Sequence, residues 1–334
     1  MTRQAADRLG AAEIDTIRQT PGRSALLFLT DRCPVGCAHC SVDSRRDSPT
    51  ITDFDLFGEI VDWLAAAPYD VVGITGGEPF VERRGLSLAV ERLGDSGKRI
   101  VVYTSGTWAT RARPPRWIAG ILETAATVYL STDAFHEEGV SDESYVHAAC
   151  AIAAADTWIV VQVLDLPPMV ERARALLQAA FGERFDEFAE LRLTTPLTAG
   201  RGSAVFRRDE RMPGHAFGPC ASVSSPTIRY DGVVTACCNE SLIMGIGPRR
   251  LRRQAGSKAE LAAVTRAFAG DPLLRVLGRA GPDVLTRHPR FADLRHREFA
   301  SICDVCWRMV ARVEADEKPD PLLRAFDTVL VPAE

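Results

Sequence analysis

Three cysteines lie within one stretch of eight residues, Cys33-Pro-Val-Gly-Cys37-Ala-His-Cys40. Because their spacing is C-x3-C-x2-C, a single loop can turn all three thiols toward one point. Three thiolates around one centre suit a soft metal ion or an iron–sulfur cluster. A closed structural zinc site needs four ligands, so three thiols leave one coordination position for another molecule.

A second group of cysteines lies toward the C-terminus, where one pair has the C-x2-C spacing of metal ligands. The thiols of this group are those of Cys220, Cys237, Cys238, Cys303 and Cys306. The stretch before Cys237 predicts a turn at Asp231-Gly232 and then a strand that ends in thiols. From the spacing alone, a four-cysteine zinc site that holds a small domain together is the better interpretation.

Apolar runs of strand length alternate with helical patterns over the first 200 residues, and each distinctive motif follows a strand. Strands are expected at 26–29, 71–75, 100–103, 128–130, 158–163 and 191–193, and helices at 11–19, 86–93, 116–123, 145–154 and 170–180. A further helix is expected to open at Thr52-Asp-Phe-Asp55, which resembles a capping box. This alternation predicts an α/β fold with a parallel sheet. Six βα units favour a partial (β/α)6 TIM-like barrel, whose chemistry sits in the loops after the strands.

Glycine, proline and charged residues cluster at 200–214 and predict a linker. We therefore expect an N-terminal lead-in at 1–22, a partial barrel at 23–200, a small cysteine-bearing domain at 201–310 and a tail at 311–334. Helices are expected in the small domain at 258–269 and 273–277.

Composition narrows the function classes. The chain has 334 residues, of which 46% are hydrophobic and 25% charged, as in ordinary globular proteins. The net charge of −4 and the lack of a Lys/Arg block argue against a nucleic-acid partner. No apolar run reaches the roughly 18–20 residues of a membrane helix, and no signal region follows the N-terminus. A cytoplasmic protein is expected, in which the cysteines are metal ligands or catalytic thiols rather than partners in disulfides. Cys150, in an Ala-rich stretch, is interpreted as a buried small hydrophobe.

The cysteine loop is followed, after the next expected strand, by Gly76-Gly-Glu-Pro79. Together they resemble the radical S-adenosylmethionine (SAM) superfamily over residues 24–200, and a further part extends the resemblance to 306. The resemblance implies that Cys33, Cys37 and Cys40 hold a 4Fe–4S cluster whose fourth iron binds SAM. One electron then cleaves SAM to a 5′-deoxyadenosyl radical, which removes a hydrogen atom from the substrate.

The resemblance also implies contacts to SAM. His39 stands where the family usually has an aromatic residue near the adenine. Gly76 and Gly77 allow close backbone approach, and Glu78 offers a negative partner to the methionine ammonium. Further contacts are expected from the ends of the third, fourth and fifth strands: Thr104, Ser105 and Gly106, then Ser131 and Asp133, then Gln162. The alternative for these polar residues is helix capping, or for the last a side chain that satisfies its neighbours.

Other interpretations of the first site remain open. The cysteine loop could be a zinc knuckle with a borrowed ligand, for which His39 is available. His136 is a candidate acid/base group or substrate contact, or an exposed histidine at the start of a helix. Arg201 is a candidate partner for a substrate carboxylate, although a linker arginine is the plainer interpretation.

The second cysteine group is similar to the auxiliary-cluster domain of the same family. The full domain carries seven cysteines and two clusters, but Arg312 stands here where a later cysteine would be expected. The similarity is therefore to the truncated form, called the twitch domain, with one auxiliary 4Fe–4S cluster. It implies Cys220, Cys237, Cys303 and Cys306 as its ligands, with Cys238 as the alternative to Cys237.

The resemblance predicts a radical SAM oxidoreductase and leaves two substrate classes, of which the first is preferred because this pair of domains is widely used on peptides. The first is a ribosomally made peptide that is oxidatively modified or cross-linked. The second is a carbohydrate or aminocyclitol, oxidised as by the small twitch-type dehydrogenases. A non-catalytic iron–sulfur or zinc protein is the alternative of another class, and the Gly-Gly-Glu-Pro turn argues against it. Expected partners are a flavodoxin- or ferredoxin-type electron donor and the substrate. Only 32 residues precede Cys33, too few for a leader-peptide-binding domain, which counts against a peptide substrate unless a separate protein supplies that domain.

Overall fold

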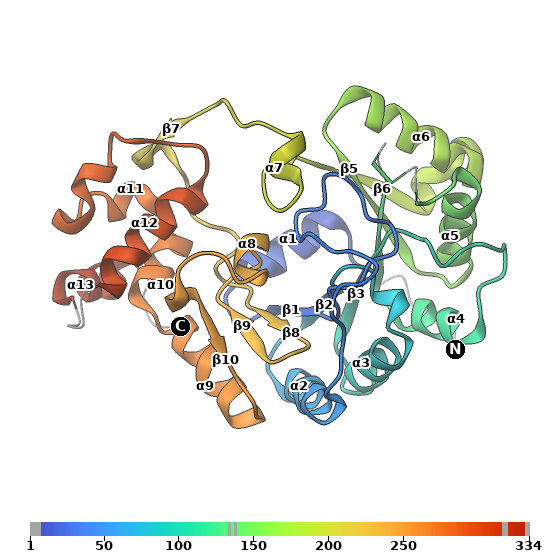
Figure 1. Ribbon diagram of the computed structural model, residues 1–334, viewed down its shortest axis with the longest axis horizontal. Helices are drawn as coiled ribbons and strands as arrows, with labels where there is room; N and C mark the ends of the chain where they lie inside the picture. The colour runs from blue at the N-terminus through green and yellow to red at the C-terminus, as the bar shows by residue number, and fades with distance from the viewer. Residues whose placement is uncertain (1–7, 133–134, 137–138, 316–319, 331–334) are drawn as a thin grey trace.

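A single sheet dominates the computed structural model, which describes residues 8–132, 135–136, 139–315 and 320–330 (Figure 1). The sheet has nine strands in the order β10-β9-β8-β1-β2-β3-β4-β5-β6. The first six are β1 (Ser24–Phe28), β2 (Val71–Thr75), β3 (Arg99–Thr104), β4 (Thr127–Ser131), β5 (Trp158–Leu164) and β6 (Ala189–Thr194). They pair in parallel in chain order. The structure thus confirms the α/β class and the expected strand order, with a longer sixth strand than the sequence predicted.

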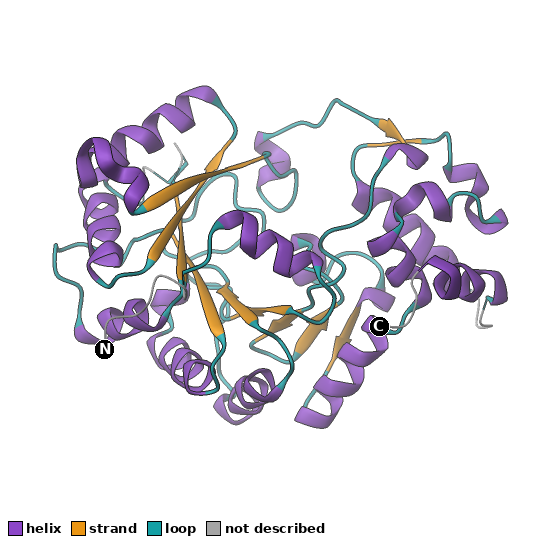
Figure 2. Cartoon of the chain, turned by 180° about the vertical axis from the view of Figure 1, so that it is seen from behind, coloured by secondary structure: helices purple, strands orange, loops and turns teal. Residues whose placement is uncertain are grey.

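Crossover helices cover one face of the sheet (Figures 1 and 2). They are α2 (Phe54–Ala66), α3 (Arg83–Asp95), α4 (Arg116–Thr124), α5 (Asp142–Ala154) and α6 (Pro167–Phe181). Alternate residues of a strand face opposite sides, and Val72 and Ile74 of β2 enter the helix-covered core with Phe57. The capping residue of α2 is Asp53, whose carboxylate accepts the N–H groups of Asp55 and Leu56. The cap is therefore one residue later than the Thr52 start of the expected capping box.

Helix α1 (Ala11–Gln19) packs on the opposite face of the same strands. Leu9 and Ile14 form a separate buried cluster there with Val71, Val101 and Val160. These strand residues alternate with those that face the crossover helices. The segment expected to be a lead-in is consequently part of the packing of the sheet.

Three strands after residue 214 extend the sheet: β8 (Thr227–Arg229), β9 (Val233–Thr235) and β10 (Arg252–Gln254). Strand β8 runs parallel to β1, with Phe28 opposite Arg229, and β9 and β10 follow in antiparallel order. The expected turn at Asp231-Gly232 is present, and Gly232 has a φ of 83°, which favours glycine.

Helices α10 to α13 and the segments around them form most of a second hydrophobic core, which includes Leu277, Phe291 and Met309, whereas Leu261 of α9 belongs to the first core. The helices of the second core gather beside the β10 end of the sheet (Figure 1). The helices of this half are α7 (Gly202–Val205), α8 (Glu240–Ile243), α9 (Lys258–Ala269), α10 (Pro272–Arg279), α11 (Gly281–Leu285), α12 (Ile302–Glu314) and α13 (Pro321–Leu330). The short pieces are β7 (Met212–Pro213), β11 (Glu298–Phe299) and the 3-10 turns Pro79–Val81, Gly182–Glu187, Gly214–Ala216, Arg249–Leu251 and Pro289–Leu294. The region expected as one small domain therefore contributes to the sheet and to this second core, and the domain division stays a prediction.

Among the described residues, no helix is both long and apolar enough to cross a membrane.

Candidate functional site

The cysteine loop begins five residues after the end of β1, at the edge of the sheet where parallel strands end. The backbone N–H of Cys33 donates to Arg45 O at 2.9 Å, and that of Cys40 donates to Cys37 O at 3.2 Å. All three cysteines are free thiols, and Cys33 is only 7% exposed. Burial raises the pKa of the Cys33 thiol to about 12. In the part of the chain that the structure describes, no three Cys, His, Asp or Glu side chains are arranged to hold a single metal ion.

The glycines of the Gly-Gly-Glu-Pro turn pack against the chain that leads into Cys33. Gly77 N–H donates to Thr30 O at 2.7 Å, and Glu78 N–H donates to Arg32 O at 2.9 Å. A Cβ atom on Gly76 would lie 2.5 Å from Thr30 O, and one on Gly77 would lie 2.3 Å from Arg32 O. Close backbone approach was expected here toward a ligand. The structure shows instead that the two glycines let the turn pack closely against residues 30–32, which lead into the cysteine loop.

Glu78 lies fully inside this junction, with an exposed fraction of 1%. Its Oε1 accepts from the Thr104 hydroxyl at 2.9 Å and from Phe80 N–H at 3.2 Å. Its Oε2 accepts from the Ser105 N–H at 2.8 Å and from the Ser105 hydroxyl at 2.6 Å. Burial raises the pKa of the Glu78 carboxyl, and these hydrogen bonds oppose that rise. Thr104 and Ser105, which were expected to contact SAM, thus fix Glu78 and join the ends of β2 and β3.

Aromatic rings gather around the middle of the cysteine loop. The ring centroid of His39 lies 4.7 Å from that of Phe135, 5.5 Å from that of His136 and 6.1 Å from that of Phe206. His136 Nε2 is 3.9 Å from Cys37 Sγ. His136 is therefore close to the cysteine loop rather than apart from it.

The other predicted contacts lie along the ends of β4 and β5. Ser131 and Gln162 are partners in the parallel register of these strands, and Thr132 N–H donates to Gln162 O at 3.1 Å. Gly106, with a φ of 82°, packs against Ala148. Asp133 lies outside the described residues.

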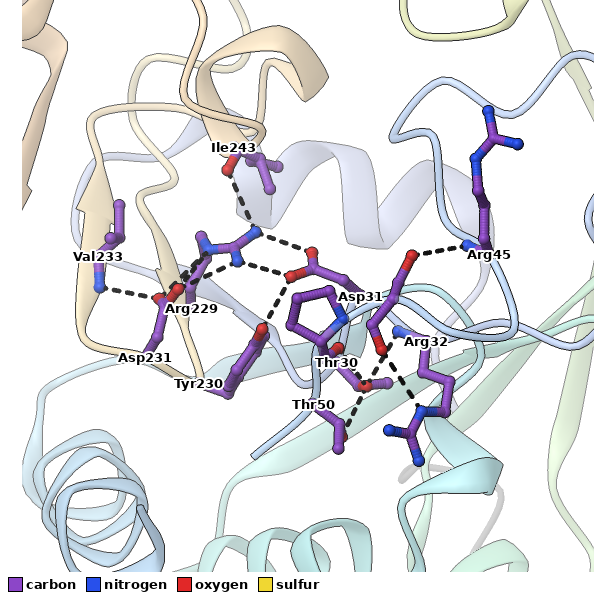
Figure 3. A network of polar contacts seen from close by, with 12 residues as sticks. Thr30, Asp31, Arg32, Arg45, Thr50, Arg229, Tyr230, Asp231, Val233 and Ile243 are labelled. Atoms are coloured by element: carbon purple, nitrogen blue, oxygen red, sulfur yellow. Dashed lines mark hydrogen bonds and ion pairs between the residues drawn. The ribbon is translucent and has the colours of Figure 1, made fainter. Parts of the chain in front are cut away.

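A polar network that sequence reasoning missed lies at the base of the loop (Figure 3). Asp31 Oδ1 and Oδ2 accept from Arg229 Nη1 and Nη2 at 3.0 and 2.8 Å. Tyr230 Oη also donates to Asp31, at 2.8 Å, and Arg229 Nη1 donates to Ile243 O at 3.2 Å. The signal that could have revealed it is Arg229 itself, a charged residue that follows Ile228 in the short buried strand β8.

The second cysteine group is brought together in the second core. Cys220, Cys237, Cys303 and Cys306 line one small enclosed cavity. Burial raises the pKa of the Cys303 thiol to about 11, and Asn239 Nδ2 lies 3.4 Å from its sulfur. Cys238 does not line this cavity. Its sulfur instead accepts a hydrogen bond from Arg18 Nη2 of α1 at 3.0 Å.

Two predicted residues have roles other than those expected. Arg201, interpreted as a linker arginine, contacts the cysteine loop through its side chain and its backbone. Cys150 is half-buried, and its thiol points to Ala180 O at 3.7 Å.

Comparisons with known proteins agree with this geometry. Residues 27–166 match the family model described as the radical SAM superfamily, and they include the cysteine loop and the Glu78 junction. Over 75 residues the chain is 33% identical to 7-carboxy-7-deazaguanine synthase of Koribacter versatilis (strain Ellin345). That match covers 22% of this chain and 32% of that protein, so the chain spans about a third of the length of this curated relative.

Several solved structures resemble the fold at low sequence identity. Native anSMEcpe with bound AdoMet has a TM-score of 0.51 and 11% identity, with 88% of this chain and 100% of that chain covered. SuiB of Streptococcus suis has a TM-score of 0.49 and 13% identity, covering 78% and 68% of the two chains. BtrN in complex with AdoMet and 2-DOIA has a TM-score of 0.43 and 13% identity, covering 84% and 93%. At such identity the first of these likenesses shows the fold alone.

Proposed function

We propose that this chain, whose residues 27–166 match the radical SAM family model, cleaves SAM reductively and uses the radical to remove a hydrogen atom from a substrate. One observation carries the proposal. The turn at Gly76–Glu78 is hydrogen-bonded to residues 30–32, so the buried glutamate is held in a fixed position beside the start of the three-thiol loop. A zinc knuckle or an iron–sulfur sensor has no need of that second component.

The residues present fit a 4Fe–4S cluster with one open position. Cys33, Cys37 and Cys40 would hold it, because they are free thiols on one loop and thiolates are the usual ligands of such clusters. When bound with SAM, the cluster supplies the electron that cleaves the sulfonium to methionine and a 5′-deoxyadenosyl radical. The residues of this chain would bind and orient SAM and the substrate, and would exclude water from the site.

The binding part falls to groups around the loop. Glu78 places a negative charge in a buried junction, where its attraction for an ammonium group is weakly screened. His39, with Phe135 and Phe206 beside it, offers flat aromatic surface for an adenine. Ser131 and Gln162 stand at neighbouring strand ends, where hydroxyl and amide groups suit a ribose or a carboxylate.

For the second cysteine group we propose an auxiliary 4Fe–4S cluster. What supports it is the enclosed cavity lined by four thiols, which supplies a complete ligand set without an open position. A cluster near the substrate radical can take up its electron, which favours net oxidation. A zinc ion in the same cavity is the alternative that the spacing alone favoured, although no three Cys, His, Asp or Glu side chains among the described residues are arranged to hold a single metal ion.

For the substrate we propose a ribosomally made peptide, modified oxidatively or cross-linked. The support is associational, since it rests on the wide use of this pair of domains on peptides. The proposal includes a flavodoxin- or ferredoxin-type electron donor, a separate leader-peptide-binding protein and a cytoplasmic setting in which the thiols stay reduced. The alternative is the oxidation of a carbohydrate or aminocyclitol.

The test of the central proposal is anaerobic reconstitution with iron and sulfide, followed by incubation with SAM and dithionite. We expect about eight irons per chain if both clusters form, and 5′-deoxyadenosine measured by mass spectrometry. Replacing Cys33, Cys37 and Cys40 by Ala should abolish 5′-deoxyadenosine, while Cys150→Ala should preserve it. Zinc in place of iron, or cleavage by the triple variant, would overturn the proposal.

The substrate class is tested with deuterium. Candidate peptides, chosen from short genes beside this one, and aminocyclitols are deuterated at carbon and offered separately. Transfer of deuterium into 5′-deoxyadenosine from a peptide supports the peptide class. Transfer only from an aminocyclitol replaces it with the dehydrogenase alternative.

A further inference from the structure

One arginine far along the chain binds the cysteine loop at several points. Arg201 Nε and Nη2 donate to Cys37 O at 3.0 and 2.8 Å. Nη2 also donates to Ser44 O at 3.1 Å, and Nη1 pairs with Asp43 Oδ1 at 2.7 Å. The backbone N–H of Arg201 donates to Cys40 O at 2.9 Å. The residue therefore ties together the loop from Cys37 to Ser44, which contains two of the three thiols.

The glycines on either side of Arg201 are shaped for this contact. Gly200 has a φ of 53°, and a Cβ atom there would lie 2.5 Å from Cys40 O. A Cβ atom on Gly202 would lie 2.3 Å from Leu197 O and 3.0 Å from His39 O. Any other residue at either position would push the segment off the loop. The contact is thus a feature of the whole Gly-Arg-Gly segment and not of one flexible side chain.

The chemistry of a guanidinium suits this task. It is planar, always charged and has five donors in a fixed fork. The carbonyls of an irregular loop need partners, and Arg201 supplies them without any change of protonation. Its side chain is only 18% exposed, whereas Asp43 is 49% exposed, so water screens the carboxylate more than the guanidinium.

Building on the proposed function, we propose that Arg201 is a positioning residue that holds the cysteine loop in its cluster-binding conformation and raises the reduction potential of that cluster. The first effect follows from the hydrogen bonds to the carbonyls of Cys37 and Ser44. The second follows from charge, because each added electron makes a cluster more negative and a nearby cation favours the reduced form.

The two effects are separable by substitution. Arg201→Ala removes both the fork and the charge, and Arg201→Lys keeps the charge but loses the paired donors. Arg208→Ala is the matched control, since it removes an exposed arginine from the same segment. Full-length proteins are reconstituted anaerobically with iron and sulfide. Iron release to a chelator and the potential of the reduced EPR signal that changes on addition of SAM are measured.

We expect Arg201→Ala to release iron from the SAM-responsive cluster at least tenfold faster than Arg208→Ala. Its reduction equilibrium should shift tenfold toward the oxidised form, about 59 mV for one electron. Arg201→Lys should keep the wild-type potential and still release iron faster. If Arg201→Ala fails to fold or to take up a cluster, the inference is tested by comparing the rate of iron release from Arg201→Lys with that from the wild type.

Equal release rates and potentials in Arg201→Ala and Arg208→Ala would overturn the inference and leave the proposed function intact. The same holds if Arg201→Lys, used when the alanine variant is not available, matches the wild type in iron release. If the wild-type protein itself binds no cluster and forms no 5′-deoxyadenosine, the proposed function fails instead.

Discussion

Asp31 and Arg229, which are 198 residues apart, form a buried two-pronged ion pair (Figure 3). Their side chains are 7% and 9% exposed. Asp31 precedes Cys33 by two residues, and Arg229 ends the strand from which the chain turns back toward Cys237. The pair therefore joins the bases of the two cysteine groups, and with Arg201 it ties the first loop to sequence that lies beyond the family match.

We predict that Arg229→Met destabilises the protein by about 3–5 kcal/mol, because it leaves the Asp31 carboxylate buried without its cation. Urea denaturation of wild type and variant measures the loss in free energy of unfolding. The control is Lys258→Ala, which breaks the Lys258–Asp62 pair, whose members are 47% and 41% exposed. That change should cost less than about 1 kcal/mol. If both substitutions lowered the free energy of unfolding by similar amounts, the buried Asp31–Arg229 pair would not be the larger contributor to stability that we predict.

Gly77→Ala should destabilise the protein and loosen the cysteine loop. The added Cβ would lie 2.3 Å from Arg32 O, which is backbone and cannot rotate away. We expect a loss of about 1–3 kcal/mol in urea denaturation and faster release of iron from the reconstituted protein. Gly120→Ala is the control, because a Cβ there meets nothing within 4 Å inside α4. It should stabilise by about 0.5–1 kcal/mol, and a neutral Gly77→Ala would refute the close packing.

Local patterns in the sequence predicted the elements because each depends on nearby residues. The apolar run Val71–Thr75 and the glycines after it suffice to place a strand and a turn. The same patterns give the parallel order of β1 to β6, since each strand is followed by a crossover helix. Lack of long-range information explains the misses. Nothing local says that Thr227–Arg229 pairs with β1, or that the lead-in helix α1 packs on the sheet face opposite the crossover helices.

The site shows the same division between local and distant partners. The thiols and Glu78 were identified because their spacing is a chemical pattern in itself. The partners of Glu78 were assigned to SAM, whereas the structure directs Thr104 and Ser105 to the glutamate. Arg201 looked like a linker residue because it binds backbone carbonyls, which every residue carries and which no residue type reveals. The spacing of residues in a sequence therefore cannot predict a contact between a side chain and the backbone of a distant segment.

The stability contributed by Glu78 should depend on pH. Burial raises its pKa above the ordinary 4.5. A carboxyl with a raised pKa holds its proton more tightly in the folded state, so its contribution is complete below pH 4.5 and is lost as the pH rises through the folded-state value. The free energy of unfolding of wild type relative to Glu78→Gln should therefore fall as the pH rises above 4.5. Urea denaturation of the apoproteins across pH 4 to 8 measures it, with the exposed Glu91→Gln as control. A relative stability that grows with pH would mean that the hydrogen bonds from Thr104 and Ser105 outweigh burial.

The adjacent thiols of Cys237 and Cys238 should behave differently on substitution. Cys237 lines the cavity shared with Cys220, Cys303 and Cys306, whereas Cys238 accepts a hydrogen bond from Arg18 outside it. If the proposed auxiliary cluster forms, Cys237→Ala should remove about four of the eight irons, because a missing thiolate leaves the cluster one ligand short. Cys238→Ala should keep them. Iron analysis and the absorption of the reconstituted proteins make the comparison, and the retention of SAM cleavage in both variants shows that the first site is intact. Loss of iron from Cys238→Ala alone would assign the ligand to Cys238 and require the two side chains to exchange places just before α8 begins.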